Sequence, residues 1–298
     1  MTEKELQKLE EKLKERERRL AEVEKNIHRQ ELTFNLDNYV VMANNMMMHS
    51  ASNLTLDELK LLRFIIMQTK KDDKELFEFE LLAKDFAKVL DINIKTKDIY
   101  KRLQTMVKHL MQEVIYIGDE SKKKWVMFHW VDVCRYDNGT IQIKISDELK
   151  PFLTHLRGNF TRYQLSEIIS FRSIYAIRLY EVLNSYLNEN SLPHADVAIE
   201  ISISVEELRK NTDTVNKFER YSSFKTYVID AAIKEINAKS KYHVTATPYK
   251  RGNAVKGFDF LIESQAGYWH RTISQEPKDE IPGQMDISDF ILYDKGRK

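Results

Sequence analysis

The sequence has little of what stabilises a small secreted protein or spans a membrane. Cys134 is its one cysteine, which excludes an intrachain disulfide and a cysteine-rich zinc site. Mean hydropathy is −0.50, and no apolar run approaches the roughly 18 residues of a membrane helix. The N-terminus carries no apolar stretch of the kind found in secretory signals. These absences predict a chain of the reducing cytoplasm without a membrane partner.

Proline is also scarce. The five prolines fall at the edges of predicted elements or near the C-terminus, at positions 151, 193, 248, 277 and 282. The chain has 298 residues, of which 42% are hydrophobic, and this is enough for about two folded domains.

The residues of common catalytic and metal sites are missing as well. The eight histidines form no H-E-x-x-H motif and no pair flanking an apolar residue, as a metal-dependent nuclease would need. The segment from Gly252 to Gly257 resembles a P-loop only in its glycines, because it lacks the lysine and the hydroxyl. Cys134 fits a buried small hydrophobe better than a nucleophile. We therefore predict no catalytic residue, no metal ligand, no cofactor and no enzyme activity.

Charge of one sign is concentrated although the net charge is only +1. Residues 95–124 carry 8 Lys and Arg against 4 Asp and Glu, and residues 217–256 carry 9 against 3. Such stretches are either solvated faces or the electrostatic footprint of a nucleic-acid-binding surface.

The first 32 residues show a heptad pattern. Leucine or isoleucine recurs every seven residues at positions 6, 13, 20 and 27, with Leu9 and Val23 three residues after two of these. This is the a/d seam of a coiled coil, although Arg16 occupies one d position and weakens it. A solvated single helix, or one that folds back on the body, remains open because four heptads are marginal.

The rest of the chain repeats one order of elements. Residues 33–53 lack periodicity and are interpreted as a linker, and Thr55 with Glu58 forms a capping box that starts a helix. The first repeat then predicts, in order, a strand at 75–81, a short helix at 82–90, a longer helix at 96–112, and strands at 114–117, 125–133 and 139–145.

The second repeat begins with a long helix predicted over 163–187. It continues with a strand at 197–203, a short helix capped by Ser204 and Glu207, a turn, a helix at 223–239, and strands at 242–249 and 257–263. Strand, short helix, turn, longer helix and β-hairpin is the order of a helix-turn-helix with a β wing.

Both longer helices are amphipathic. In the helix at 96–112, an apolar face opposes a polar one that consists of Lys97, Lys101, Gln104, Thr105 and Lys108. Lysine neutralises phosphate and glutamine pairs with adenine, so this face suits a DNA major groove. Without the surrounding elements, a solvated face would be the better interpretation.

In the helix at 223–239, Phe224, Val228, Ala231, Ala232 and Ile236 are predicted to face inward. Asn237 is expected to face outward. The predicted reading residues are Ser223, Thr226, Tyr227 and Asp230, and the predicted phosphate contacts are Lys225 and Lys234. Tyr227 is alternatively a core aromatic, and Asp230 either a surface acid or an acceptor from cytosine N4.

Two basic turns complete the candidate site. The predicted wing turns carry Lys122, Lys123 and Lys124 in the first repeat and Lys250, Arg251 and Lys256 in the second. Basic wings position a protein on the phosphate backbone rather than specify sequence.

Two helical motifs resemble a known family. SIYAIRLYEVL at 173–183 and FKTYVIDAAIKEIN at 224–237, supported by LKPFLTHLRGNFTRYQL at 149–165, are similar to the Rep_3 family of plasmid replication initiators. The similarity covers about residues 33–264. It implies an α+β fold of two winged-helix domains with a pseudo-two-fold relation, preceded here by the charged N-terminal helix. The predicted domains are 33–157 and 158–264, between the heptad segment 1–32 and a flexible tail 265–298.

The resemblance also implies partners. These are double-stranded origin DNA with direct repeats (iterons), a second copy of the chain in a repressing dimer, and the host initiator and helicase. The helix around Arg178 and Glu181, which are spaced to pair, is then structural. A transcription repressor without a replication role, an enzyme such as a relaxase, and a scaffold for an acidic protein remain as alternatives.

Overall fold

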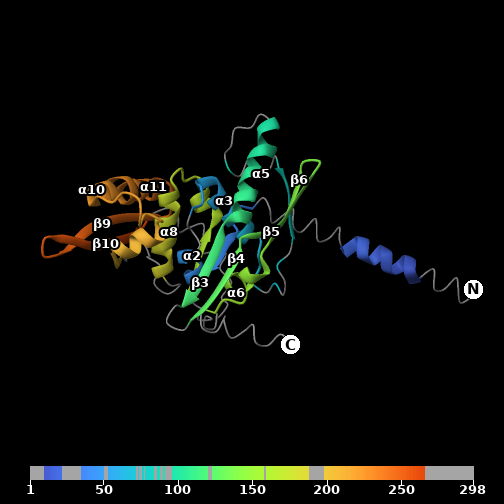
Figure 1. The fold of residues 1–298 in the computed structure, drawn as a ribbon, viewed down its shortest axis with the longest axis horizontal. Coiled ribbons are helices and arrows are strands. Elements are labelled where there is room, and N and C mark those ends of the chain that lie inside the picture. The colour runs from blue at the N-terminus through green and yellow to red at the C-terminus, as the bar shows by residue number, and fades with distance from the viewer. Residues whose placement is uncertain are drawn as a thin grey trace, which may run out of the picture.

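The computed structural model describes residues 10–21, 35–49, 53–71, 73, 76, 78–83, 86–87, 90, 96–119, 123–157, 159–187 and 198–265. Within these ranges the chain forms a mixed helix and strand body, and a helix over residues 10–21 stands apart from it (Figure 1). No helix among these residues is long and apolar enough to cross a membrane.

The N-terminal half of the body runs from residue 35 to the end of a central helix, α8. Its elements are β1 (Tyr39–Ala43), α2 (Asn44–His49), α3 (Leu56–Met67), β2 (Glu78–Leu82), α5 (Thr96–Gln112), β3 (Val114–Asp119), β4 (Lys124–His129), β5 (Val131–Asp137), β6 (Thr140–Ile145), η1 (Asp147–Leu149), α6 (Lys150–Leu153), β7 (Phe160–Gln164), α7 (Leu165–Ile169) and α8 (Ile174–Tyr186). The strands form a three-stranded sheet, β2–β6–β5, and two separate pairs, β1–β7 and β3–β4.

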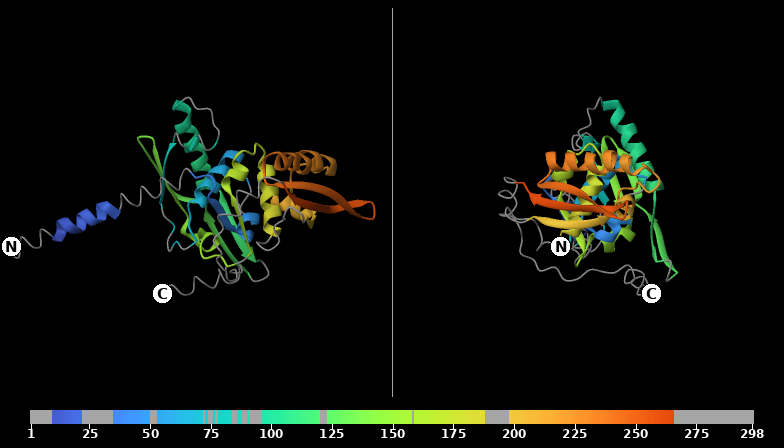
Figure 2. Two further views of the ribbon diagram at one scale, coloured as in Figure 1. Left: turned by 180° about the vertical axis from the view of Figure 1, so that it is seen from behind. Right: turned by 90° about the vertical axis from the view of Figure 1, so that its left-hand side faces the viewer.

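The C-terminal half is a smaller unit around one three-stranded sheet, β8–β10–β9. Its elements are β8 (Ile199–Ser204), α9 (Val205–Asn211), α10 (Tyr221–Phe224), the π-helical segment η2 (Lys225–Asp230), α11 (Ala231–Lys239), β9 (Tyr242–Arg251) and β10 (Ala254–Ser264). In Figures 1 and 2, α10 and α11 lie over this sheet, and the turn of the β9–β10 hairpin projects outward from the body.

The linker predicted over residues 33–53 is wrong. Residues 39–43 form β1, which pairs antiparallel with β7 from Tyr39 opposite Gln164 to Ala43 opposite Phe160. Val40 on this strand is fully buried. A strand whose partner lies some 120 residues further along shows little local periodicity that would identify it.

The long helix predicted over 163–187 is also wrong in its first third. This stretch contains the end of β7, then α7 and α8, with a break at residues 170–173. The Ser173 hydroxyl caps α8 by accepting from Tyr175 N at 3.2 Å. The Glu235 carboxylate accepts from Arg172 N at 2.7 Å and from Ser173 N at 3.0 Å. At the break, the Ser173 hydroxyl and the Glu235 carboxylate thus accept from backbone N–H groups that a continuous helix would bond internally.

Other predicted elements are confirmed. The helix at 96–112 has the predicted bounds, and the strands at 75–81, 139–145 and 197–203 shift by only a few residues. The strand predicted at 125–133 divides at Trp130 into β4 and β5. Both predicted N-caps form, with Thr55 and Glu58 bonded reciprocally and Ser204 accepting from Glu207 N. Of the short helix at 82–90, residues 84–85 and 88–89 lie outside the described residues.

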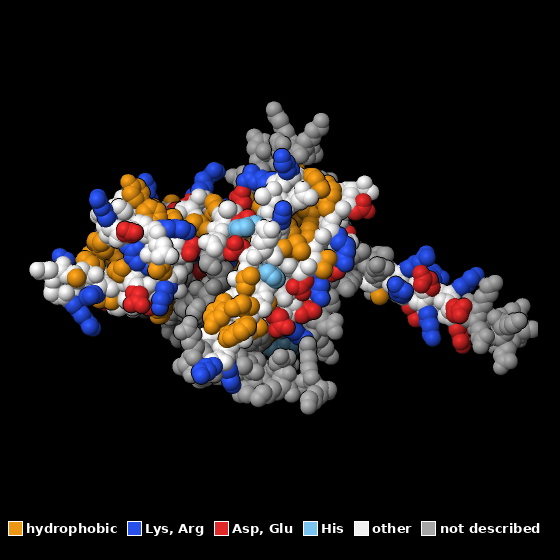
Figure 3. Space-filling model, viewed as in Figure 1, with side chains coloured by type: hydrophobic (Ala, Val, Ile, Leu, Met, Phe, Trp, Pro, Cys, Tyr) orange, Lys and Arg blue, Asp and Glu red, His pale blue; other side chains and the backbone are white. Residues whose placement is uncertain are grey.

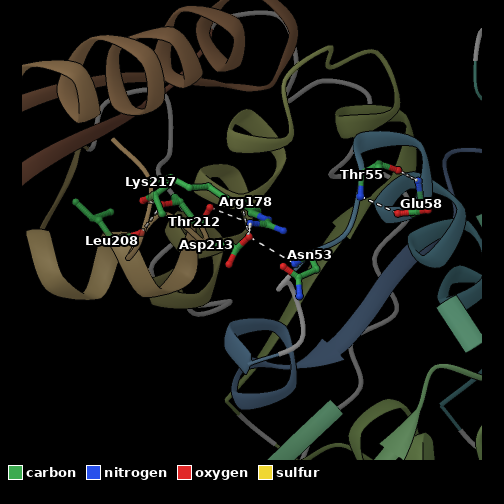
Figure 4. A network of polar contacts seen from close by, with 9 residues as sticks. Asn53, Thr55, Glu58, Arg178, Leu208, Thr212, Asp213 and Lys217 are labelled. Carbon is green, nitrogen blue, oxygen red and sulfur yellow. Dashed lines mark hydrogen bonds and ion pairs between the residues drawn. The ribbon is translucent and has the colours of Figure 1, made fainter. Parts of the chain in front are cut away.

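A buried charge network holds the centre of the body. Arg63 on α3 donates to Glu181 on α8 from Nε at 2.6 Å and from Nη2 at 3.0 Å, and both side chains are almost inaccessible. Arg178 instead donates to Thr212 O at 2.8 Å and lies 3.6 Å from Asp213 (Figure 4). The Glu181 carboxylate is taken by Arg63, and the suggested pairing of Arg178 with Glu181 stays a prediction.

The helix over residues 10–21 is exposed along its whole length. Leu13 and Leu20, which belong to the heptad seam, are 54% and 55% exposed. Folding back on the body, one of the alternatives for this segment, is therefore not observed for residues 10–21. Residues 1–9 and 22–34 and most of the predicted tail lie outside the described residues.

Candidate nucleic-acid interface

The second candidate recognition helix runs from Tyr221 to Lys239 through α10, η2 and α11. Four predicted inward residues are fully buried, namely Phe224, Val228, Ala232 and Ile236. Ala231, which was predicted to face inward, is exposed, and Ile229 is buried instead. The cause is η2, whose i→i+5 bonding widens the turn and shifts the register of the helix.

The outward face of this helix is polar. Thr226, Tyr227, Asp230 and Lys234 are exposed, whereas Ser223 and Lys225 are partly buried. Tyr227 is 62% exposed and its ring centroid lies 6.0 Å from that of Phe218, so the core alternative for Tyr227 is wrong. An aromatic side chain in this position is available to a groove or a sugar-phosphate strand.

Asn237 does not belong to that face. Its side-chain amide donates to Val244 O at 2.9 Å and accepts from Val244 N at 2.7 Å. The predicted outward orientation is therefore wrong, and Asn237 instead attaches β9 to the helix.

A turn held by Arg209 precedes this helix. Its guanidinium donates to the carbonyl oxygens of Thr214, Lys217 and Phe218 at 2.8–3.0 Å. The same group lies 4.3 Å from the centre of the Phe224 ring. Arg209 therefore fixes the turn between α9 and the recognition helix. Sequence reasoning missed it, because a side chain that bonds only backbone carbonyls follows no motif.

The β9–β10 hairpin forms the wing of the second repeat. Lys250, Arg251 and Lys256 are all exposed near its turn, as predicted. Gly252 has φ +62°, which suits glycine in the turn. A bulge between Val255 and Gly257 interrupts the register, and a Cβ on Gly257 would lie 2.4 Å from Ile203 O. The strand after the turn can therefore approach β8 closely only with glycine here.

The first candidate recognition helix, α5, has the faces that were predicted. The inward side chains are at most 8% exposed, namely Ile99, Leu103, Met106, Val107 and Leu110. The exposed side chains are Lys101, Gln104, Thr105 and Lys108. The side chain of Lys97 lies outside the described residues.

Ion pairs attach α5 to α3. Arg102 pairs with Asp57, and His109 bridges Glu58 at 2.9 Å and Glu113 at 3.1 Å. The hydrogen bond that His109 donates to Glu58 raises the pKa of His109 above its ordinary value, and the charges of both glutamates act in the same direction. These contacts hold the helix by one side and leave its cationic side free of α3.

The wing predicted for the first repeat is placed on the wrong hairpin. In the second repeat, the strand before the helices (β8) pairs with the last hairpin strand, β10. The corresponding strand in the first repeat, β2, pairs with β6. The wing is therefore β5–β6, with a turn at Asn138 and Gly139, and β3–β4 is an insertion. The Asn-Gly dipeptide is a strong hairpin signal that identifies this turn from sequence.

The lysines at 122–124 belong to that inserted hairpin. Lys123 is exposed and Lys124 half-buried, while Lys122 lies outside the described residues. The far end of β3–β4 points to the lower side of the molecule in Figures 1 and 2. Next to it lies an apolar patch, visible in Figure 3, whose exposed side chains are Val114, Tyr116, Trp125 and Met127.

The two recognition helices belong one to each half of the molecule. α5 rises to the top of the body, and the α10–α11 helix lies along the upper side of the C-terminal half in all three ribbon views (Figures 1 and 2). Among the described residues, no cluster of three or more His, Cys, Asp or Glu side chains is arranged to hold a metal ion. The arrangement provides two polar and cationic surfaces and their wings.

Two long helices with polar outer faces, each completed by a hairpin whose last strand pairs with the strand before the helices, define a tandem winged-helix protein. The chain belongs to the family of initiator replication proteins. The model of the first winged-helix domain of that family matches residues 39–184, and the model of the second matches residues 204–262. The first range includes β7 and α8, which the sequence analysis assigned to the second domain. The division at residue 157 stays a prediction.

Individual relatives agree with this assignment. A replication initiation protein of Escherichia coli is 24% identical over 172 residues, which are 58% of this chain and 52% of the relative. The match thus spans about half the length of that protein. A crystal structure of the Pi initiator protein in complex with iteron DNA has a TM-score of 0.64 at 20% identity, covering 78% of this chain and 99% of that one. This second likeness shows the fold.

Proposed function

We propose that this chain initiates plasmid replication by binding directly repeated origin DNA through α5 and the α10–α11 helix. The observation that carries the proposal is that each of the two helices has exposed polar side chains backed by buried apolar ones. Membership of the initiator family and the iteron DNA bound to the Pi protein support it.

The proposed interface consists of the polar face of each helix and the turn of the β9–β10 wing. Its residues are Lys97, Lys101, Gln104, Thr105 and Lys108 on α5, Ser223, Lys225, Thr226, Tyr227, Asp230 and Lys234 on the second helix, and Lys250, Arg251 and Lys256 at the wing. Lysine and arginine would position the backbone, and Gln104, Thr226 and Asp230 would contact base edges.

The action we propose is non-enzymatic. Binding to tandem repeats would deform an adjacent A·T-rich duplex, after which a host initiator and helicase would load. The protein would act in the bacterial cytoplasm, where its plasmid replicates.

Footprinting on the origin of the parent replicon tests the proposal. Protection should recur with the period of the direct repeats, and log K should fall with log[salt] by about 0.9 for each phosphate contact. Absence of protection on the repeats, or salt-independent binding, would contradict it.

A second candidate function is repression of the chain's own promoter by a dimer on an inverted repeat. The exposed seam leucines Leu13 and Leu20 favour it, because an unpaired heptad face offers a self-association surface. Competition between direct-repeat and inverted-repeat duplexes separates the two functions. A chain that binds only the inverted repeat would be a dedicated repressor.

A further inference from the structure

Segment η2 contains an ion pair between Lys225 and Asp230. The Lys225 ammonium donates to both carboxylate oxygens of Asp230 at 2.7 Å. Residues five apart lie about 140° apart around an α-helix, which has 3.6 residues per turn. The π-helical backbone of η2 brings them onto one side. The wide turn and the ion pair thus occupy the same six residues of the recognition helix.

Asp230 lies in the middle of the face that we assign to DNA. Thr226 lies one turn before it and Lys234 one turn after it, and both are exposed. The Asp230 side chain is itself 46% exposed. A carboxylate in this place repels the phosphates of any duplex and binds the lysine that would otherwise contact one. Because the carboxylate lowers affinity for DNA in general, its presence on this face indicates a role in selecting the sequence that is bound.

The carboxylate has a partner in the major groove of selected sequences. Cytosine N4 and adenine N6 present amino donors there, whereas guanine and thymine present acceptors. Where an amino group meets Asp230, the carboxylate can accept from the base while Lys225 turns to a phosphate. On other sequences that exchange leaves the carboxylate unpaired beside phosphate oxygens.

We infer that Asp230 is a specificity-determining residue, which withholds Lys225 from phosphate until a base amino group replaces the lysine as its partner. This inference rests on the proposed function, since it assumes that the helix enters a major groove. It assigns the ion pair to suppression of non-specific binding. Non-specific complexes then make one phosphate contact fewer than the specific complex.

Fluorescence anisotropy over a salt series tests the inference on a direct-repeat duplex from the origin and on a scrambled duplex. Asp230→Asn keeps the side-chain shape and removes the charge. Affinity for the scrambled duplex should rise about three- to tenfold near 0.1 M salt, and its salt slope by about 0.9, as one added phosphate contact requires. Affinity for the direct repeat should rise less, so discrimination should fall.

A double-mutant cycle shows whether the effect passes through the lysine. In a Lys225→Met background, Asp230→Asn should no longer raise the salt slope. The matched control is Glu206→Gln, which removes an exposed carboxylate paired with Lys210 within α9, outside the recognition helix. It should leave both duplexes unchanged. Circular dichroism checks that each variant keeps its helices.

The outcomes separate the two levels of the proposal. If the natural chain discriminates between the duplexes but Asp230→Asn behaves like Glu206→Gln, the inference is overturned and the function stands. A gain that persists without Lys225 also overturns it, because the carboxylate would then act by direct repulsion. If the natural chain binds neither duplex, the proposed function fails and this inference with it.

Discussion

At the scale of single residues, substitution of the buried pair Arg63–Glu181 should strongly destabilise the fold. Their side chains are 0% and 2% exposed, and Tyr163 also donates to Glu181. Arg63→Met leaves the carboxylate buried without its counter-ion. We expect a loss of about 3–5 kcal/mol in the free energy of unfolding, as for other broken buried pairs. Denaturant unfolding followed by circular dichroism measures it.

The control for Arg63→Met is Lys210→Met, which breaks the exposed pair with Glu206. Exposed ion pairs contribute about 0–1 kcal/mol, so this variant should unfold almost as the natural chain does. Equal midpoints for the two variants would contradict the importance of the buried network.

His109 makes the attachment of α5 to α3 sensitive to pH. Its pKa is raised above 6.5 in the folded chain, first by the hydrogen bond that it donates to Glu58. A group with a raised folded pKa contributes stability below its unfolded pKa and loses it as pH rises through the folded value. The free energy of unfolding should therefore fall as pH rises from about 6.5, by about 1 kcal/mol for a pair whose histidine is 33% exposed.

Thermal unfolding of the natural chain and of His109→Gln across pH 5.5–8.5 measures this contribution. The difference between the two chains should be largest at the acid end and shrink as pH rises. His243→Gln is the control, since it removes an exposed histidine from β9 and leaves the α3–α5 contacts in place. A constant difference across the series would mean that the charge of His109 does not matter.

At the scale of elements, the two hairpins that carry lysines should differ in their effect on DNA. Lys250→Ala with Arg251→Ala removes two exposed cations from the β9–β10 wing, and the salt slope should fall by about 1.8. Lys123→Ala with Lys124→Ala should leave the slope nearly unchanged, because β3–β4 points away from the recognition helices. Anisotropy at several salt concentrations makes the comparison, and equal losses would restore β3–β4 to the interface.

Elements defined by local signals could be predicted from the sequence. α5 has the predicted bounds because its apolar side chains recur at helical spacing over seventeen residues. Its exposed lysines followed from the same periodicity. The turn and wing of the second repeat are likewise marked by glycine and basic residues close together in the chain.

Elements defined by distant partners could not be predicted in this way. β1 depends on β7, and the break before α8 depends on the Glu235 carboxylate from another helix. The π-helical turn changed which side of the helix Ala231 occupies, and simple periodicity assumes that no such turn exists. The Asn-Gly dipeptide marks the β5–β6 turn, but only the pairing of β2 with β6 shows that this hairpin, and not β3–β4, is the wing.

Across the whole molecule, the two halves are joined through α7 and α8. Lys239 donates to Ser170 O at 2.9 Å, Lys241 lies 3.1 Å from Glu167, and Tyr242 donates to Asn184 at 3.0 Å. Burial raises the pKa of Glu167. Burial alone would lower the pKa of Lys241, but the neighbouring charge of Glu167 outweighs it and raises this pKa. The recognition helix of the second half is thus anchored to the first half at its C-terminal end, which fixes the spacing of the two helices.

Self-association through the N-terminal helix is the remaining question at this scale. Leu13 and Leu20 are exposed on the described part of the seam, and Arg16 occupies a position between them that a stable dimer would fill with an apolar residue. A weak dimer would deplete the monomer only at high concentration. Mass action would then connect the proposed repression of the chain's own promoter to the concentration of the protein.

Replacing both leucines by glutamate tests this directly. Light scattering should show the natural chain shifting toward twice its mass as its concentration rises, and Leu13→Glu with Leu20→Glu should remain monomeric. Gln7→Glu with Ala21→Glu adds the same charge off the seam and should behave as the natural chain does. If the seam variant dimerises as strongly as this control, the helix is a solvated arm, and any dimer forms through the body.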